Sequence, residues 1–153
     1  MKALDGLRVI DVTQAMAAPF CTMNLADMGA DVIKVEPPGG EDMRRGAAGK
    51  NGHSGTFLAM NRDKRGITVD LKRPEGVEIV RRLVKTADVF VQNYRPGVAG
   101  RLGVAWEDLQ PINPRLIYCS ISGFGMTGPY APRSAPPIAW PRPTRRCGPA
   151  TAG

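Results

Sequence analysis

Short apolar runs alternate along the chain with longer segments that have helical spacing. The runs with the length and composition of buried strands are Leu7 to Val12, Asp31 to Val35, Ile67 to Leu71, Val89 to Val91 and Leu116 to Ile121. Val89 to Val91 is continuously apolar, as expected for a strand that is covered on both faces of a parallel sheet. Because strands and helices alternate, the sequence predicts an α/β fold with a mostly parallel sheet.

The segments between these runs carry start and stop signals of helices. Pro19 suits the first position of a helix because its fixed φ angle needs no amide donor, and Pro74 with Glu75 fits the first turn of another. Gly29 can adopt the left-handed conformation that ends a helix. Helical spacing predicts two stripes that face the core: Cys21, Leu25 and Met28, and Val77, Val80, Leu83, Val84 and Ala87.

Two regions interrupt this pattern. Residues 37–66 are rich in glycine and charge, and we expect a long loop with a short helix near Phe57 to Met60. A weaker helix is expected over Trp106 to Gln110. After Tyr130 the chain has six prolines and no periodic apolar face, which predicts a disordered tail. The predicted division is therefore a folded part, residues 1–131, and a tail rich in proline and arginine, residues 132–153.

The net charge of +7 is unevenly distributed. Residues 1–131 carry 17 basic and 14 acidic side chains, and residues 132–153 add four arginines and no acid. The folded part shows no basic groove interleaved with aromatics, so no nucleic-acid partner is expected. No apolar run approaches the ~18 residues of a membrane span, so no membrane partner is expected. The first residues lack the apolar stretch of a secretory signal, which predicts a cytoplasmic location.

Few side chains are candidates for metal binding or nucleophilic catalysis. The cysteines lack C-x-x-C spacing and only one histidine accompanies them, so neither a disulfide framework nor a metal is predicted: Cys21, Cys119, Cys147 and His53. Cys21 and Cys119 fall on apolar faces, where inert buried thiols are expected. His53 has no identifiable partner for a general-base role. Asp11 and Asp31 flank strands, and local structural roles explain them. No residue is therefore predicted to be catalytic.

Segments that follow the strands could bind a phosphorylated ligand. Thr13 to Pro19 lies at a helix amino terminus, where free amides favour phosphate, although it could equally be a tight connection. The GxGxxG and GxxxxGK[ST] motifs are absent, which argues against NAD and P-loop chemistry. Lys64, Arg65 and Lys72 could meet phosphates, or could belong to a solvated charged face.

Two later segments are further candidates. In VQNYRPG, Asn93 could bond an adenine or ribose edge and Tyr94 could stack, or the segment could be only a turn. SGFGMTGPY, residues 122–130, could let the backbone approach a thioester closely, or could be a flexible exit loop.

Four stretches occur in a characteristic order: GLRVIDVTQAMAAPFCTMNLADMGADVIKVEPPGG, NRDKRGITVDLKRPEG, ADVFVQNYRPGVAGRLGV and NPRLIYCSISGFGMTGPY. Together they resemble the family III CoA-transferases, which include formyl-CoA and carnitine CoA-transferases and the related α-methylacyl-CoA racemases. The resemblance runs from about Leu4 to Tyr130. Pro37 and Pro38 depart from it, because some members carry basic residues there.

The resemblance implies a Rossmann-like large domain that binds coenzyme A, of which residues 1–131 would be the amino-terminal part. It also implies a smaller second domain and an interlinked homodimer. The implied substrates are an acyl-CoA and a carboxylic acid, with no metal. The coenzyme A contacts expected by position are Gln14, Ala15, Val69, Lys72, Asn93, Tyr94 and Arg101.

The resemblance further implies where the chemistry lies. In the transferases, an aspartate downstream of GFGxTGPY attacks the acyl-CoA thioester, and acyl-aspartyl and CoA-aspartyl intermediates pass coenzyme A to a second carboxylate. In the racemases, a histidine and an aspartate after that segment move the α-proton. Leu109 to Gly153, 45 residues, contains no Asp or Glu. We therefore expect a truncated transferase, inactive alone, with a frameshift after about Pro132. The alternatives are a racemase fragment, a non-catalytic CoA-binding module, or a product that does not fold stably.

Overall fold

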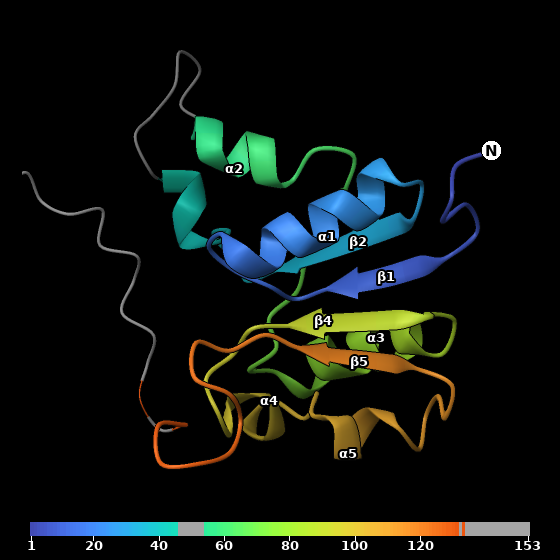
Figure 1. The fold of residues 1–153 in the computed structure, drawn as a ribbon. Coiled ribbons are helices and arrows are strands. Elements are labelled where there is room, and N and C mark those ends of the chain that lie inside the picture. The colour runs from blue at the N-terminus through green and yellow to red at the C-terminus, as the bar shows by residue number, and fades with distance from the viewer. Residues whose placement is uncertain (46–53, 132, 134–153) are drawn as a thin grey trace, which may run out of the picture.

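A computed structural model of the chain describes residues 1–45, 54–131 and 133. These residues form a parallel sheet in the order β3-β2-β1-β4-β5, which confirms the predicted α/β class (Figure 1). The strands are β1 (Arg8–Asp11), β2 (Asp31–Glu36), β3 (Arg65–Thr68), β4 (Val89–Gln92) and β5 (Ile117–Ser120). The order runs outward from β1 in both directions, so the sheet has a topological switch point between β1 and β4.

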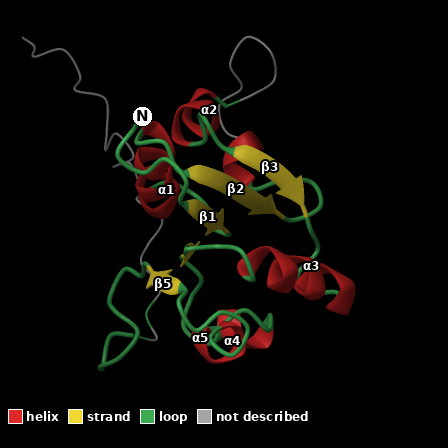
Figure 2. Ribbon diagram, turned by 90° about the vertical axis from the view of Figure 1, so that its right-hand side faces the viewer, coloured by secondary structure: helices red, strands yellow, loops and turns green. Residues whose placement is uncertain are grey.

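Helices cover both faces of the sheet. Helices α1 (Ala17–Asp27) and α2 (Gly55–Met60) lie on one side, and α3 (Pro74–Val84), α4 (Val98–Arg101) and α5 (Trp106–Leu109) lie on the other (Figure 2). A short 3₁₀ helix, η1 (Asp42–Arg45), follows β2. The central strands are buried because they are covered on both faces, as their unbroken apolar sequences predict.

The larger core lies between the sheet and α3, α4 and α5. Val80, Val84 and Ala87 are buried there, as the predicted stripe of α3 requires. Phe90 of β4 has no exposed surface, and its ring stacks on Tyr118 of β5 at 5.4 Å between centroids. The aromatic pair therefore links the two strands beside the switch point to this core.

The predicted core stripe of α1 is wrong at Met28, whereas Leu25 does pack against the smaller core cluster. Met28 is 50% exposed, while Cys21 and Leu25 are only partly buried. The face that lies on the sheet is instead formed by small or compact residues: Ala18, Pro19, Thr22, Met23 and Ala26. Alanine and threonine allow the helix to approach the strands closely, and a buried polar group of β1 holds the Thr22 hydroxyl.

Several predicted boundaries shift by a few residues. Pro19 is the third residue of α1 rather than the first, a position where the amide also has no partner within the helix. Gly29 does adopt a left-handed φ of +104°, and a Cβ there would lie 2.5 Å from Asp5 Oδ1. Strand β3 begins at Arg65 and ends at Thr68, not Ile67 to Leu71, and α4 had no predicted counterpart.

Some predictions fall on residues outside the described part. These include the disordered or frameshifted tail, apart from Arg133, and the roles of His53 and Cys147, so all of them stay predictions. In the described residues, none of the helices has the length and apolar character to span a membrane.

Replacing Phe90 with alanine should lower the free energy of unfolding by about 3–5 kcal/mol, because it opens a cavity where the ring contacts Tyr118. Urea unfolding followed by circular dichroism measures the change. Ile79→Ala on α3 is the control: its side chain is 39% exposed, and a loss of about 0.5 kcal/mol or less is expected. Equal losses in the two variants would contradict this description of the core.

Candidate functional site

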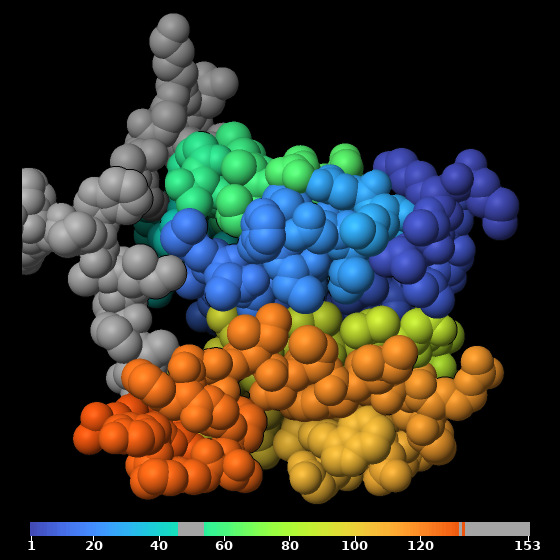
Figure 3. Space-filling model, viewed as in Figure 1, coloured from blue at the N-terminus to red at the C-terminus, as the bar shows by residue number. Residues whose placement is uncertain are grey.

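The segments that follow the strands gather at the carboxyl edge of the sheet. The start of α1, the η1 and α2 region, and the segment after β5 all lie toward the left of Figure 1, the side to which the strand arrows point, and on the same side of Figure 3. In open α/β sheets, ligands bind at this edge, next to the switch point. The side chains between β1 and β4 are therefore the first candidates.

Two polar residues join β1 and β4 across the switch point. The Gln14 amide donates to Asn93 Oδ1 at 2.9 Å, and Asn93 Nδ2 donates to the Gln14 carbonyl at 2.8 Å. Ala15, the next residue, has a left-handed φ of +66°. A non-glycine residue adopts that conformation at a cost, so the surrounding contacts must hold the turn in place.

The carboxylate of Asp11, at the end of β1, is buried next to this turn. Asp11 has no exposed surface, and its Oδ1 accepts from the Thr13 amide at 2.8 Å and from the Thr13 hydroxyl at 2.5 Å. Its Oδ2 accepts from the Thr22 hydroxyl at 2.6 Å and from Lys64 Nζ at 3.0 Å. The role assigned to Asp11 from sequence was local, and the structure adds a partner 53 residues away.

Lys64 and Arg65 are not available to a ligand phosphate at this edge, contrary to the sequence-based interpretation. The Lys64 side chain is only 1% exposed and its ammonium already meets four acceptors. Burial lowers the pKa of Lys64, although the Asp11 charge opposes that shift. Arg65 begins β3 at the opposite edge and pairs with Asp31 at 2.8 and 2.6 Å.

A second set of charges connects the end of β2 with the segment that follows it. Lys34 Nζ donates to the Thr13 carbonyl at 2.9 Å and pairs with Glu41 at 3.4 Å. Arg44 binds both carboxylate oxygens of Glu36, at 2.6 and 2.7 Å. Burial raises the pKa of Glu41, whose Oε1 accepts no hydrogen bond from any residue in the described ranges. These pairs hold the loop after β2 against the turn after β1.

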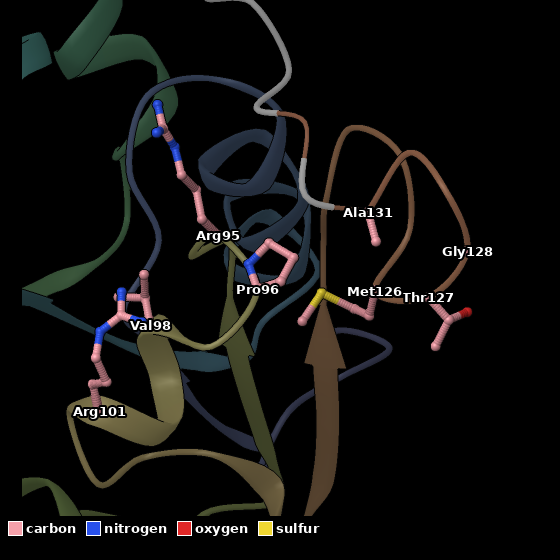
Figure 4. Close-up of a pocket in the computed structure, with 8 residues that line it drawn as sticks. All are labelled: Arg95, Pro96, Val98, Arg101, Met126, Thr127, Gly128 and Ala131. Carbon is pink, nitrogen blue, oxygen red and sulfur yellow. The ribbon is translucent and has the colours of Figure 1, made fainter.

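A cleft of about 520 Å³ opens between the segments that follow β4 and β5 (Figure 4). One wall comes from the loop after β4 and from α4, and the other comes from the glycine-rich segment after β5. Its lining residues are Arg95, Pro96, Val98, Arg101, Met126, Thr127, Gly128 and Ala131. Two guanidinium groups and an apolar lining suit a ligand that combines an anion with an apolar or aromatic body.

Comparisons with known proteins identify the family. A sequence profile of CoA-transferase family III matches residues 4–138. The chain belongs to this family. It is 50% identical over 136 residues to succinyl-CoA:glutarate CoA-transferase of Mus musculus, covering 88% of this chain and 31% of that protein. It is also 50% identical over 131 residues to formyl-CoA:oxalate CoA-transferase of Rhodopseudomonas palustris, covering 84% and 31%.

The fold agrees with that of a solved family member. A CAIB/BAIF family protein from Brucella suis superposes with a TM-score of 0.81 at 47% identity, covering 87% of this chain and 36% of that one. The chain therefore spans about a third of the length of the curated relatives it matches.

The contacts expected from the family resemblance occupy different surroundings. Gln14 and Asn93 are joined at the switch point, and Arg101 lines the cleft. Tyr94 packs against the α3 side of the core, where burial, helped by the charge of Asp11, raises its pKa to about 12. Lys72 is exposed in the loop after β3.

The remaining two expected contacts are Ala15 and Val69. Ala15 follows Gln14 in the strained turn, and Val69, after β3, is 4% exposed and belongs to the core, so its side chain offers little surface to a ligand. Arg95 and Met126 line the cleft but were not predicted from the sequence as site residues. Their segments were candidates, but spacing alone does not show which side chains of a loop face a cleft.

Arg44→Gln should lower the free energy of unfolding at pH 7 by about 1–3 kcal/mol, since it removes charge-assisted bonds to a buried carboxylate. Burial pushes the pKa of Glu36 up, but the bonds from Arg44 and from the Glu41 amide outweigh burial and leave it below the ordinary 4.5. The stabilisation is therefore complete above pH 4.5 and is lost as the pH falls through the folded-state pKa.

Urea unfolding of the two proteins between pH 7 and pH 3 tests this pH dependence. The difference between wild type and Arg44→Gln should shrink below pH 4.5. A difference that stays constant across the range would show that Arg44 acts through its packing on Phe57 rather than through its charge.

Proposed function

We propose that this chain binds coenzyme A at the carboxyl edge of its sheet and forms the CoA-binding part of a CoA-transferase. The observation that carries the proposal is the joining of Gln14 and Asn93 across the switch point, next to a cleft with two arginines. The names of the curated relatives support acyl-CoA and a carboxylic acid as the substrates.

In this proposal, each part of coenzyme A meets a group of matching chemistry at this edge. Arg95 and Arg101 supply charge for phosphate groups, and guanidinium groups bind phosphate through paired N–H donors. Pro96, Val98 and Met126 supply apolar surface for an adenine or a pantetheine arm. No acidic residue occupies the first turn of α1, where the helix dipole favours an anion.

The reaction proposed for the whole transferase is the movement of coenzyme A from a thioester to a second carboxylate. An aspartate attacks the thioester carbonyl and releases the CoA thiolate, which then returns to form a CoA-aspartyl intermediate and frees the first acid. The second carboxylate takes the place of the first in the reverse sequence. The attacking aspartate must have a free carboxylate that faces the cleft.

This chain does not supply that aspartate in the proposal. Its buried acids, Asp11, Glu36 and Glu41, are engaged by lysine or arginine below the turn. From Leu109 onward the sequence carries no Asp or Glu at all. We therefore propose that the chain is inactive by itself and corresponds to the amino-terminal part of the transferase.

The absence of an acid from the lining of the described cleft equally supports a second candidate, a CoA-binding module without catalysis. An acyl-CoA exchange assay separates the two candidates when the remaining polypeptide of a curated relative is added, since only a transferase part would gain activity. An interlinked homodimer, a cytoplasmic location and the racemase alternative stay predictions.

Calorimetry with coenzyme A tests the binding proposal. Wild type should bind, and Arg101→Gln should raise Kd roughly tenfold to a hundredfold because a charge-assisted contact is lost. Arg82→Gln, an exposed arginine on α3, is the matched control and should leave Kd unchanged. If coenzyme A gives no binding heat with folded wild-type protein, the proposal is wrong.

The chain alone should not transfer coenzyme A from succinyl-CoA to glutarate, the reaction named for its murine relative, because no acid lines the described cleft to act as the nucleophile. Liquid chromatography of the CoA esters measures the transfer. Turnover above the protein-free blank, retained after purification to constant specific activity, would contradict the assignment of the chemistry to residues outside this chain.

A further inference from the structure

Lys64 connects three segments that are far apart in the sequence. Its ammonium lies 3.0 Å from Asp11 Oδ2 at the end of β1 and 2.8 Å from the Thr22 hydroxyl in α1. It also lies 3.0 Å from the Pro19 carbonyl and 3.0 Å from Asn61 Oδ1, just after α2. All three N–H bonds of the ammonium are therefore used inside the protein, and none is left for a ligand.

These contacts also fix the conformation of the β1–α1 turn, residues 13–15. Lys64 and Thr22 fix one oxygen of Asp11, and the other oxygen holds the amide and the hydroxyl of Thr13. Lys34 holds the Thr13 carbonyl from the neighbouring strand. The orientation of the Asp11 carboxylate therefore sets the direction of the chain as it leaves β1.

In the described residues, the main-chain groups of Thr13 and Gln14 in the β1–α1 turn bond to side chains. Asp11 and Lys34 satisfy the Thr13 amide and carbonyl, and Asn93 satisfies both groups of Gln14. Ala15 follows with its left-handed φ of +66°. A turn with no backbone ladder of its own keeps such a conformation only while these side chains stay in place.

We propose that Lys64 is a positioning residue that acts through Asp11 to hold the β1–α1 turn in the shape that receives coenzyme A. The inference rests on the proposed function for the identity of the ligand, while the part that concerns the turn stands on the contacts alone. Lys64 touches no ligand in this proposal. Replacing the Lys64 side chain should increase the mobility of the β1–α1 turn more than that of the rest of the fold.

The first test is amide hydrogen exchange followed by mass spectrometry. In Lys64→Met, exchange in peptides covering residues 12–17 should be at least tenfold faster than in wild type, while peptides from α3 and β4 should change much less. Arg65→Gln is the matched control, because it removes the neighbouring cation and its bonds to Asp31 at the far edge of the sheet. Exchange in residues 12–17 should not change in this control.

A second variant covers the case in which Lys64→Met leaves Asp11 unpaired and does not fold. Thr22→Val removes only the hydroxyl between the two charges and keeps the shape of the side chain. It should accelerate exchange of the β1–α1 turn roughly threefold. If a folded Lys64 or Thr22 variant exchanges in this segment like Arg65→Gln, Lys64 does not position the turn.

The ligand half of the proposal is measured separately by calorimetry with coenzyme A. Folded Lys64→Met or Thr22→Val should raise Kd, with the larger rise, at least tenfold, for Lys64→Met. An unchanged Kd in a variant with a loosened turn would show that the turn does not receive coenzyme A. Absence of binding by wild type would refute the proposed function, and the exchange data would still decide the role of Lys64.

Discussion

The pairing of Asp11 with Lys64 is the interaction on which the arrangement of the carboxyl edge depends. Both side chains are almost completely removed from water, at 0% and 1% exposure. A buried carboxylate without a partner costs several kcal/mol, so the pair forms only where further donors and acceptors complete it. Thr13, Thr22 and Asn61 complete it here. The chain thus brings β1, α1 and the segment after α2 together to satisfy two charges.

The two edges of the sheet use ion pairs differently. At the amino edge, Arg8 and Arg65 share Asp31 with a third or more of each side chain exposed, so water screens these pairs and they add little stability. Near the carboxyl edge, the Asp11 and Lys34 pairs are buried and each also binds a main-chain group of the turn after β1. Buried pairs contribute little net stability for their cost, but they fix geometry. Rigid geometry is what a binding edge requires.

The strand and helix pattern could be predicted from sequence because it rests on local apolar spacing and on proline and glycine. Val80, Val84 and Ala87 of the predicted α3 stripe are buried for that reason, while Val77 and Leu83 are partly buried. The α1 stripe is partly wrong because the helix lies on the sheet through Ala18, Thr22 and Ala26, whose small size and hydroxyl matter more than their hydrophobicity. Apolar spacing identifies the most hydrophobic face of a helix. It does not show where small side chains let the helix pack closely against a sheet.

The candidate site was predictable by segment and less so by residue. Gln14 and Asn93 follow strands that turned out to be neighbours, and strand order cannot be obtained from spacing alone. Lys64 shows the limit most clearly. Its position in a run of charged residues suggested an exposed side chain that could bind phosphate. Its partner Asp11 is 53 residues away in the sequence, so only the folded chain shows the pair.

Binding and chemistry make opposite demands on carboxylates in this chain. A carboxylate that positions a turn must be buried and fully paired, as Asp11 and Glu36 are, because any freedom would move the turn. A carboxylate that attacks a thioester must keep a lone pair free and face the ligand. One residue cannot meet both demands. Asp11 and Glu36 meet the first demand, and no acid lines the described cleft. In the proposed function, the nucleophile of a complete transferase therefore comes from another segment that approaches the cleft.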